Sequence, residues 1–197
     1  MSRLLSKKDM QGASFSIHPL AKPAFQFYQQ LNHQFDPTQF NSGHNLTHLL
    51  SSQALLTIKI NQHDYQIFSG FEHHFFDINQ VSSSRSNVLI YPSDFNTDEI
   101  EEIAWVGVMR SVFSSIRSDS LGQLYTQINE NISAQLMLQL FGKSHLSELK
   151  LANISCTTRS TISKQKELII LAAPEPTSSI SIFEQLVSGN QDDQRRN

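Results

Sequence analysis

The spacing of apolar residues changes halfway along this 197-residue chain, and the change restricts the fold more than any other feature. In the first half, the short runs 54–60, 65–68 and 88–91 are rich in the β-branched and aromatic residues typical of strands. From Leu121 onward, apolar residues recur three and four positions apart, which is the spacing of one helix face. The sequence therefore predicts an α+β protein, with a small mixed α/β lobe followed by an all-helical lobe.

Three further segments frame the two predicted lobes. The first residues are polar and are expected to be flexible, and the residues past Pro174 are polar with a few apolar interruptions. Between the lobes, Asn96 is expected to cap a helix in which Ile100, Ala104 and Val108 lie at helical spacing. In order, the division is a flexible N-terminus (1–16), the mixed lobe (17–95), a linking helix (96–118), the helical lobe (119–172) and a polar tail with a short amphipathic segment (173–197).

Composition limits the compartment and the partners. The single cysteine, Cys156, excludes an internal disulfide framework and a cysteine-rich zinc site, which favours a cytoplasmic location. No apolar run is long enough for a signal peptide or a membrane span, so no membrane partner is expected. The net charge of −3 does not by itself indicate nucleic-acid binding. Residues 131–170, however, hold five basic side chains against two acidic ones, so this part is locally basic.

A glycine interrupts the second of the predicted strands. The apolar run that starts at Tyr65 stops at Gly70, and Glu72, His73 and His74 follow directly, ahead of two phenylalanines. Glycine permits positive φ, and a helix N-terminus carries a partial positive charge, so a strand, a turn and a helix start in this order can form an anion pocket. A plain strand-to-helix connection with a glycine at the bend explains the same residues.

The helical lobe contains two candidate helix-turn-helix units. In one, a helix from Leu121 to about Asn131 precedes a helix that ends at Gly142, and the DNA-reading helix follows this glycine. In the other, residues 147–154 form the first helix and residues 158–165 the reading helix, whose Arg, Lys, Gln and hydroxyl side chains suit phosphate and base-edge contacts. The turn of the second unit is expected to be longer than usual. The Gly142 register is therefore preferred, with residues 158–165 as a flanking DNA contact.

Taken in order, these pieces resemble the ParB/sulfiredoxin-like superfamily, and specifically ParB-type partition proteins. That family has a strand-turn-helix with the pattern A-G-E-R-R, a short strand, an acidic helix ending near an arginine, an A-x-x-Y helix, and a helix-turn-helix whose glycine precedes Lys-Ser. The resemblance covers about residues 40–150 and implies a ParB-like front lobe and a helix-turn-helix lobe that binds double-stranded DNA. The corresponding stretches are Tyr65–His73, Asn87–Tyr91, Thr97–Ala104, Arg110, Leu124-Tyr125 and Leu138–Ser144.

Two departures limit what the resemblance implies. Where the family's arginines grip nucleotide or phosphate after the turn glycine, this chain has His73 and His74, which hold no permanent charge near neutral pH. Gly70, Glu72 and His73 are therefore interpreted as a degenerate nucleotide or phosphate site without CTP hydrolysis. Cys156 lies far from the turn glycine, so the redox chemistry of sulfiredoxin is not expected. No catalytic residue, cofactor or metal site is predicted.

The resulting prediction is a non-enzymatic, sequence-specific DNA-binding protein of ParB-like type, acting in plasmid or mobile-element partition or in transcriptional regulation. Because a single helix-turn-helix binds weakly, a homodimer or a partner protein is expected. The helix after Gly142 is expected to enter the major groove, with Ser144, His145 and Ser147 at base edges. The phosphate contacts are assigned to the basic side chains Lys143, Lys150, Arg159, Lys164 and Lys166.

Two other functions are weighed against this prediction. The first is a degenerate ParB-like adaptor module that mediates protein–protein assembly in a nucleoprotein complex without nucleotide chemistry. The second, which the sequence favours least, is a phosphate-transfer enzyme or nuclease that uses the Gly70 turn. Salt-dependent binding to duplex DNA separates the DNA-binding protein from the adaptor, because phosphate contacts release counterions.

Overall fold

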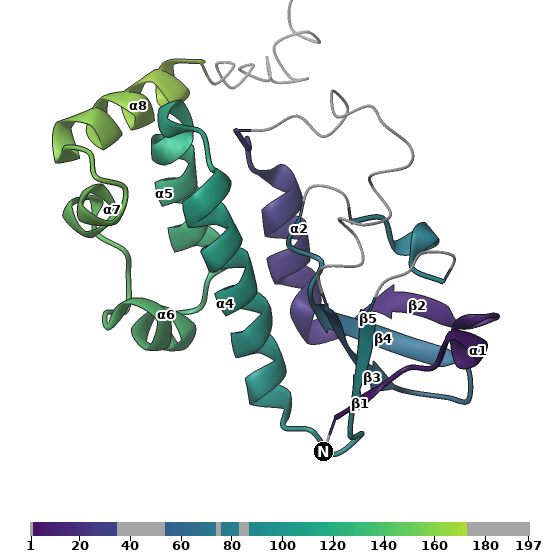
Figure 1. The fold of residues 1–197 in the computed structure, drawn as a ribbon. Helices are drawn as coiled ribbons and strands as arrows, with labels where there is room; N and C mark the ends of the chain where they lie inside the picture. Colours follow the sequence, from purple (N-terminus) through teal and green to yellow (C-terminus); the bar gives the residue numbers. More distant parts are fainter. Residues whose placement is uncertain (1, 35–53, 74–75, 83–86, 173–197) are drawn as a thin grey trace, which may run out of the picture.

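The computed structural model describes residues 2–34, 54–73, 76–82 and 87–172, and it has the mixed α+β architecture that the sequence predicts (Figure 1). Within these ranges the chain forms one five-stranded mixed sheet and seven α-helices. The strand order across the sheet is β1-β5-β3-β4-β2. The strands are β1 (Arg3–Leu4), β2 (Ser14–Ile17), β3 (Ala54–Lys59), β4 (Asp64–Ser69) and β5 (Asn87–Tyr91).

The centre of the sheet is the predicted hairpin. Strands β3 and β4 are antiparallel, with Thr57 opposite Ile67, and both side chains are fully buried. In the turn, Asn61 Nδ2 donates a hydrogen bond to the carboxylate of Asp64 at 3.1 Å, which suits the polar turn residues found there. Strand β5 pairs in parallel with β3 on the other side. All three strands predicted from β-branched content are confirmed.

The expectation of a flexible N-terminus is wrong for the described residues 2–16. Strand β1 pairs antiparallel with β5, and β2 pairs in parallel with β4 at the opposite edge of the sheet. The ring of Phe15 on β2 stacks on that of Tyr65 with 5.6 Å between centroids. Between the strands, helix α1 (Lys7–Met10) is capped by Ser6, whose hydroxyl oxygen accepts from the Asp9 N–H. Strands of two and four residues are too short to show a spacing pattern in sequence.

The sequence also predicts a helix around residues 25–34, after an entry segment with two prolines, and helix α2 (Lys22–Gln30) begins and ends earlier than this prediction. Pro23 lies in its first turn, where the missing N–H has no helical partner to lose, so proline marks the start of this helix rather than excluding it. A short 3₁₀ turn, η1 (Pro19–Ala21), precedes it. The sequence predicts a second helix in the front half, at residues 45–53, but these residues lie outside the described ones, as do His74 and the tail 173–197.

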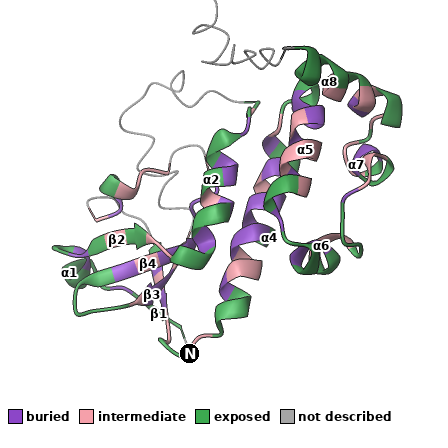
Figure 2. Ribbon diagram, turned by 180° about the vertical axis from the view of Figure 1, so that it is seen from behind, coloured by how far each residue is buried: buried purple, intermediate pink, exposed green. Residues whose placement is uncertain are grey.

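Helix α4 (Thr97–Ser115) lies within the predicted linking helix, 96–118, and begins directly after the predicted cap, Asn96. The Asn96 side-chain oxygen accepts from the Asp98 N–H at 3.1 Å. The predicted apolar positions Ile100, Ala104 and Val108 are buried. Helix α4 packs against α2 and β4, so it belongs to the core of the sheet lobe and also leads into the helical lobe (Figure 2).

The back half is helical, as predicted. After the 3₁₀ turn η4 (Ser118–Ser120), α5 (Leu121–Asn131) and α6 (Ala134–Phe141) match the expected helices to within a residue. Gly142 ends α6 with a φ of 74°, a left-handed conformation that glycine adopts without strain. Two further helices follow, α7 (Glu148–Ile154) and α8 (Arg159–Ala172). No described helix is both long and apolar enough to cross a membrane.

Candidate nucleic-acid interface

Helices α7 and α8 have the element order and the turn length of a helix-turn-helix. Four residues, Ser155 to Thr158, separate them, whereas six residues, Gly142 to Ser147, separate α6 from α7. The short turn is closed by a hydrogen bond from the Thr157 N–H to the Ala152 carbonyl at 2.9 Å. Cys156 takes a left-handed conformation with a φ of 52°, the backbone arrangement that ends a helix in a Schellman motif. Of the two predicted registers, the downstream one therefore has the compact turn.

The preferred Gly142 register is corrected by this geometry. Lys143, Ser144 and His145 lie in the connection between α6 and α7 and not on a helix that starts at the glycine. Ser147 is the N-cap of α7, where its hydroxyl oxygen accepts from the Lys150 N–H at 3.2 Å. The expectation of a longer turn in the downstream register is also wrong, because the left-handed Cys156 lets the chain reverse within four residues.

The inner face of α8 is fixed to α5. Ile162 is fully buried, and the side chain of Gln165 bridges two backbone groups at the start of α5. Its Oε1 accepts from the Gly122 N–H at 2.9 Å, and its Nε2 donates to the Ser118 carbonyl at 2.9 Å. Gly122 permits this approach, because a Cβ there would lie 2.7 Å from the Cβ of Gln165. Gln165, which the sequence places at the end of the candidate reading helix 158–165, is therefore a packing residue in the structure.

One carboxylate ties the first turn of α7 to α8. Glu148 accepts from Lys166 Nζ at 2.7 Å and from Arg159 Nε at 3.1 Å. The hydrogen bond from Lys166, followed by that from Arg159, lowers the pKa of Glu148, and the same contact with Glu148 raises the pKa of Lys166. The Lys166 ammonium also lies 4.4 Å from the centre of the Tyr125 ring. The sequence alone shows Glu148 only as one of the two acidic residues in the basic stretch 131–170.

These contacts divide the predicted phosphate-binding residues. The side chain of Lys166 is only 28% exposed and faces α5 and α7, so its assignment to DNA is corrected to a packing role. Arg159 is 72% exposed and uses only its Nε toward Glu148, which leaves its terminal nitrogens toward solvent. Lys143, Lys150 and Lys164 are exposed and make no ion pair with any described residue.

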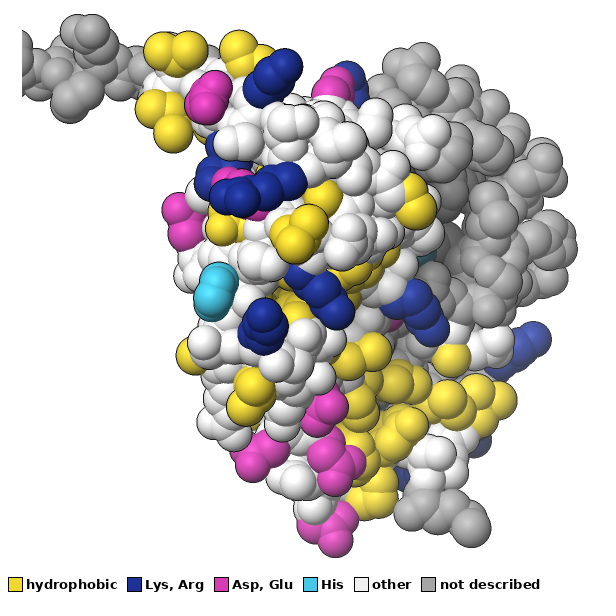
Figure 3. Space-filling model, turned by 90° about the vertical axis from the view of Figure 1, so that its left-hand side faces the viewer, with side chains coloured by type: hydrophobic (Ala, Val, Ile, Leu, Met, Phe, Trp, Pro, Cys, Tyr) yellow, Lys and Arg dark blue, Asp and Glu magenta, His cyan; other side chains and the backbone are white. Residues whose placement is uncertain are grey.

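On the side of the molecule where α6, α7 and α8 lie, basic side chains gather around the middle of the view, and acidic side chains gather below them (Figure 3). On α8, Ser160 and Lys164 are exposed four residues apart on the side opposite to the buried Ile162. Arg159 is also exposed, but it lies three residues before Ile162, on the side of α8 that faces Glu148 of α7. Of the predicted residues in 158–165, Ser160 and Lys164 therefore share one outward face, as a groove-reading helix requires, and Arg159 lies beside that face.

A cavity of about 380 Å³ lies beside the Gly70 turn, but it does not have the arrangement predicted for an anion pocket. Gly70 has a φ of 93°, but no helix follows in residues 71–73, so no helix N-terminus points at the turn. The Gly70 N–H donates instead to Glu72 Oε2 at 2.8 Å, and Ser69 Oγ donates to Oε1 at 3.2 Å. The Glu72 side chain is 2% exposed, and the exposed Arg110 lies 3.9 Å from it. The chain's own carboxylate occupies the place predicted for an anion.

The third predicted residue of that site, His73, lies apart from the Glu72 carboxylate. Its ring packs edge to face on Phe76 with 5.9 Å between centroids, beside a separate cavity at the end of α2. The structure therefore brings Gly70 and Glu72 together and places His73 elsewhere. In the described ranges, no three His, Cys, Asp or Glu side chains are grouped so that they could hold a metal ion.

Comparisons with known proteins do not add to this geometry. No protein-family model, no curated protein and no solved structure matches the chain. The fold is a mixed α+β fold in which a four-residue turn joins the last two described helices, α7 and α8.

Proposed function

We propose that this protein is a sequence-specific, double-stranded DNA-binding protein in which α8 enters the major groove. The observation that supports this most directly is the α7–α8 pair, with its four-residue turn, its buried inner face and its cationic outer face. In a helix-turn-helix the second helix reads base edges with residues near its N-terminus. Arg159 and Ser160 occupy that place on α8, with Lys164 one turn further on.

Phosphate contacts fall to the basic side chains around α8. Lys143 and Lys150 come from the connection before α7 and from α7 itself, and both are exposed. Ser144 and His145 lie in the same connection and are exposed beside Lys143, so they contact the DNA backbone or an adjacent base. Ser147 uses its hydroxyl oxygen to cap α7, and its contribution to DNA is through the helix that it starts.

The proposal also includes the process in which the protein binds DNA. The ParB-like resemblance supports a role in plasmid or mobile-element partition, and a transcriptional regulator uses the same contacts. Two copies of one helix-turn-helix read two half-sites, so a homodimer or a partner protein accompanies this function. The buried Glu72 carboxylate at the Gly70 turn supports a protein without nucleotide hydrolysis, because it repels a phosphate there.

Protection mapping of genomic fragments by the purified protein, followed by titrations at several salt concentrations, tests the proposal. The double variant Lys143→Glu and Lys164→Glu should weaken binding to a protected fragment and lower its salt dependence by about one unit of slope per lost phosphate contact. The matched control is Lys7→Glu and Lys22→Glu, which makes the same charge change at exposed positions of α1 and α2. Equal affinity in the two double variants would show that the assigned surface does not bind DNA.

A second candidate, an adaptor that assembles with other proteins, is favoured by one observation. The last turn of α8 exposes four consecutive apolar side chains, Leu168, Ile169, Ile170 and Leu171 (Figure 3). An exposed apolar patch of this kind is common at protein–protein contacts. Under the adaptor hypothesis, replacing both Leu168 and Leu171 by glutamine or serine should abolish self-association or partner binding. The unaltered protein should then also show no salt-dependent binding to DNA.

A further inference from the structure

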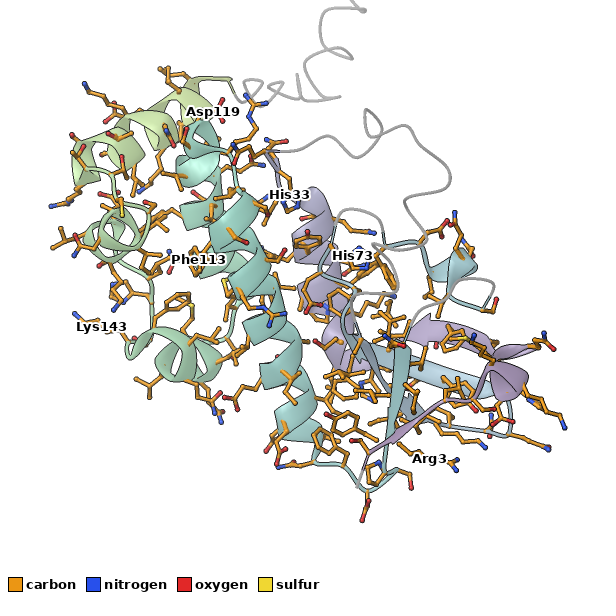
Figure 4. All side chains as sticks on the ribbon, in the orientation of Figure 1. Arg3, His33, His73, Phe113, Asp119 and Lys143 are labelled. Carbon is orange, nitrogen blue, oxygen red and sulfur yellow. The ribbon has the colours of Figure 1, made fainter. Side chains whose placement is uncertain are left out.

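A cavity of about 540 Å³ opens at the end of α2, away from the α7–α8 pair. Its described walls come from the C-terminal half of α2, the segment after β4 and the junction between α4 and η4. His33 and His73 lie on the same side of α4 near this cavity, whereas Lys143 lies on the opposite side of that helix (Figure 4). This volume is within the range of small-molecule sites in proteins, and the mechanism proposed for DNA binding does not use it.

The apolar part of the cavity is built from aromatic rings. Phe25 meets Phe71 and Phe76 edge to face, with centroids 5.3 and 6.1 Å apart and interplanar angles of 85° and 80°. His73 continues the set against Phe76 at 89°. Phe25, Phe76 and His73 are only partly buried, so ring surface remains open to the cavity. Such edge-to-face sets accept a further planar ring at the same spacing.

Where its wall is described, the polar part of the cavity contains one permanent cation, Arg117. Arg117 and two histidines line it, and no carboxylate is among the described lining residues. Arg117 is held side-on by Asp119, with Nε donating at 3.1 Å and Nη2 at 2.6 Å, and its Nη1 has no partner among the described residues. The Arg117 backbone N–H donates to the Asn32 carbonyl at 3.3 Å, which fixes the arginine beside the end of α2. A guanidinium nitrogen in this position suits an anionic oxygen.

We propose that this cavity binds a small planar aromatic carboxylate, with its ring against Phe25 and Phe76 and its carboxylate at Arg117 Nη1. Aromatic walls select a flat apolar body, and the Arg117 nitrogen that Asp119 does not use selects a negative group over a neutral or positive one. The proposal does not rest on DNA binding, because the cavity and the α7–α8 pair share no residue.

The cavity also touches the connection between the two parts of the chain. Asn32, which lines the cavity, donates from Nδ2 to Gln123 Oε1 on α5 at 3.0 Å, and the Gln34 N–H donates to the Ser115 carbonyl at 2.6 Å. A ligand that orders Arg117 and Asn32 therefore stabilises the contact of α2 with α4 and α5. Binding of the carboxylate should therefore raise the melting temperature of the protein.

Isothermal titration calorimetry of the full-length protein, without DNA, tests the site with three probes: naphthalene-2-carboxylate, benzoate and the neutral naphthalene-2-carboxamide. We expect saturable 1:1 binding of naphthalene-2-carboxylate, weaker binding of benzoate because it covers less ring surface, and at least about tenfold weaker binding of the carboxamide. Saturable binding of neither carboxylate at millimolar concentration, or equal binding of carboxylate and carboxamide, would overturn the proposal.

Three variants locate the site. Arg117→Gln should weaken naphthalene-2-carboxylate binding by about tenfold or more, and Asp119→Asn should strengthen it, because the competing carboxylate is removed from Arg117. Arg110→Gln removes another exposed arginine, which lies outside the cavity, and should leave the affinity for naphthalene-2-carboxylate unchanged. If Arg117→Gln lowers the melting temperature, Phe76→Leu supplies a second test by removing ring surface. An affinity unchanged in both Arg117→Gln and Phe76→Leu contradicts the assignment.

Discussion

Glu148 in the first turn of α7 accepts hydrogen bonds from both Lys166 and Arg159 of α8, at 2.7 and 3.1 Å. The carboxylate joins positions 18 and 11 residues away in sequence, so it holds the two helices in one relative orientation. It also removes one cation from the outer surface and orients another. The same contact thus contributes to stability and sets which basic side chains remain available to a ligand.

Replacing Glu148 by Gln should lower the free energy of unfolding by about 1 kcal/mol, because charge-assisted hydrogen bonds become neutral ones in a partly solvated place. The thermal unfolding of the variant and of the unaltered protein, compared at pH 7, measures the loss. Glu102→Gln on α4 is the matched control, since it removes a partly exposed carboxylate that has no ion pair among the described residues. Equal losses in both variants would contradict a specific role for Glu148.

The pH dependence of stability follows from the direction of the Glu148 pKa shift. Because the pKa of Glu148 is lowered in the folded protein, mainly by Lys166, its contribution is present above the ordinary glutamate pKa and is lost as the pH falls through the lowered value. The stability difference between the unaltered protein and Glu148→Gln should therefore shrink as the pH is lowered below about 4.3. Denaturant titrations at pH 7, 5 and 3 measure it, and a difference that stays constant contradicts the ion pair.

Cys156 has an unfavourable conformation for its side chain. With a φ of 52° it lies in the left-handed region, and it is the only described residue other than glycine with a positive φ. Cys156→Gly should raise the free energy of unfolding by up to about 1 kcal/mol, because glycine adopts this conformation without a Cβ clash. Cys156→Val should lower it, since a β-branched side chain disfavours this region further. Chemical denaturation measures both, with Cys156→Ala as reference, and the reverse order would exclude the proposed turn geometry.

Replacing Gly122 on α5 by alanine is expected to lower stability, whereas the same change at an exposed helix glycine usually raises it. Alanine at an exposed helix position stabilises by about 1 kcal/mol relative to glycine. At Gly122, however, a Cβ would lie 2.7 Å from the Gln165 Cβ and 2.8 Å from the Lys166 backbone nitrogen, so α8 must move away. Gly122→Ala should destabilise by about 1–3 kcal/mol and also weaken DNA binding. Gly107→Ala on α4 provides a comparison, because its Cβ would clash with the Glu72 carboxylate, so it should destabilise without a direct effect on α8.

The parts of the fold that the sequence predicts are those with a long, regular apolar pattern. Strands β3 and β4 are runs of six residues whose β-branched and aromatic content is typical of strands, and Ile100, Ala104 and Val108 repeat at helical spacing. The edge strands β1 and β2 are too short for that, and their pairing depends on partners about 50 or more residues away. No local signal in the first sixteen residues identifies such partners.

The interface was harder to predict because its decisive contacts are not visible in local sequence. The Gly142 register was preferred because the downstream turn was expected to be longer than usual, whereas a left-handed cysteine makes that turn compact. Lys166 and Lys164 are equivalent by charge, and only the position of Glu148 and Tyr125 separates their roles. A usable signal was present in the cap residues, since Ser147 and Thr158 both precede the helices that they cap.

Lys164 and Lys166 therefore provide the sharpest test of how charge is divided on α8. Lys164→Met removes an exposed cation with no ion pair in the described chain, so it should leave the melting temperature nearly unchanged and weaken DNA binding by a few-fold, with a lower salt slope. Lys166→Met leaves Glu148 with one partner fewer and removes the cation from the Tyr125 ring, so it should lower the melting temperature. At a temperature where both variants are folded, Lys166→Met should retain the salt slope of the unaltered protein. If instead the two variants lose DNA affinity and salt slope equally, Lys166 contacts DNA, and the inward role assigned to it by Glu148 is wrong.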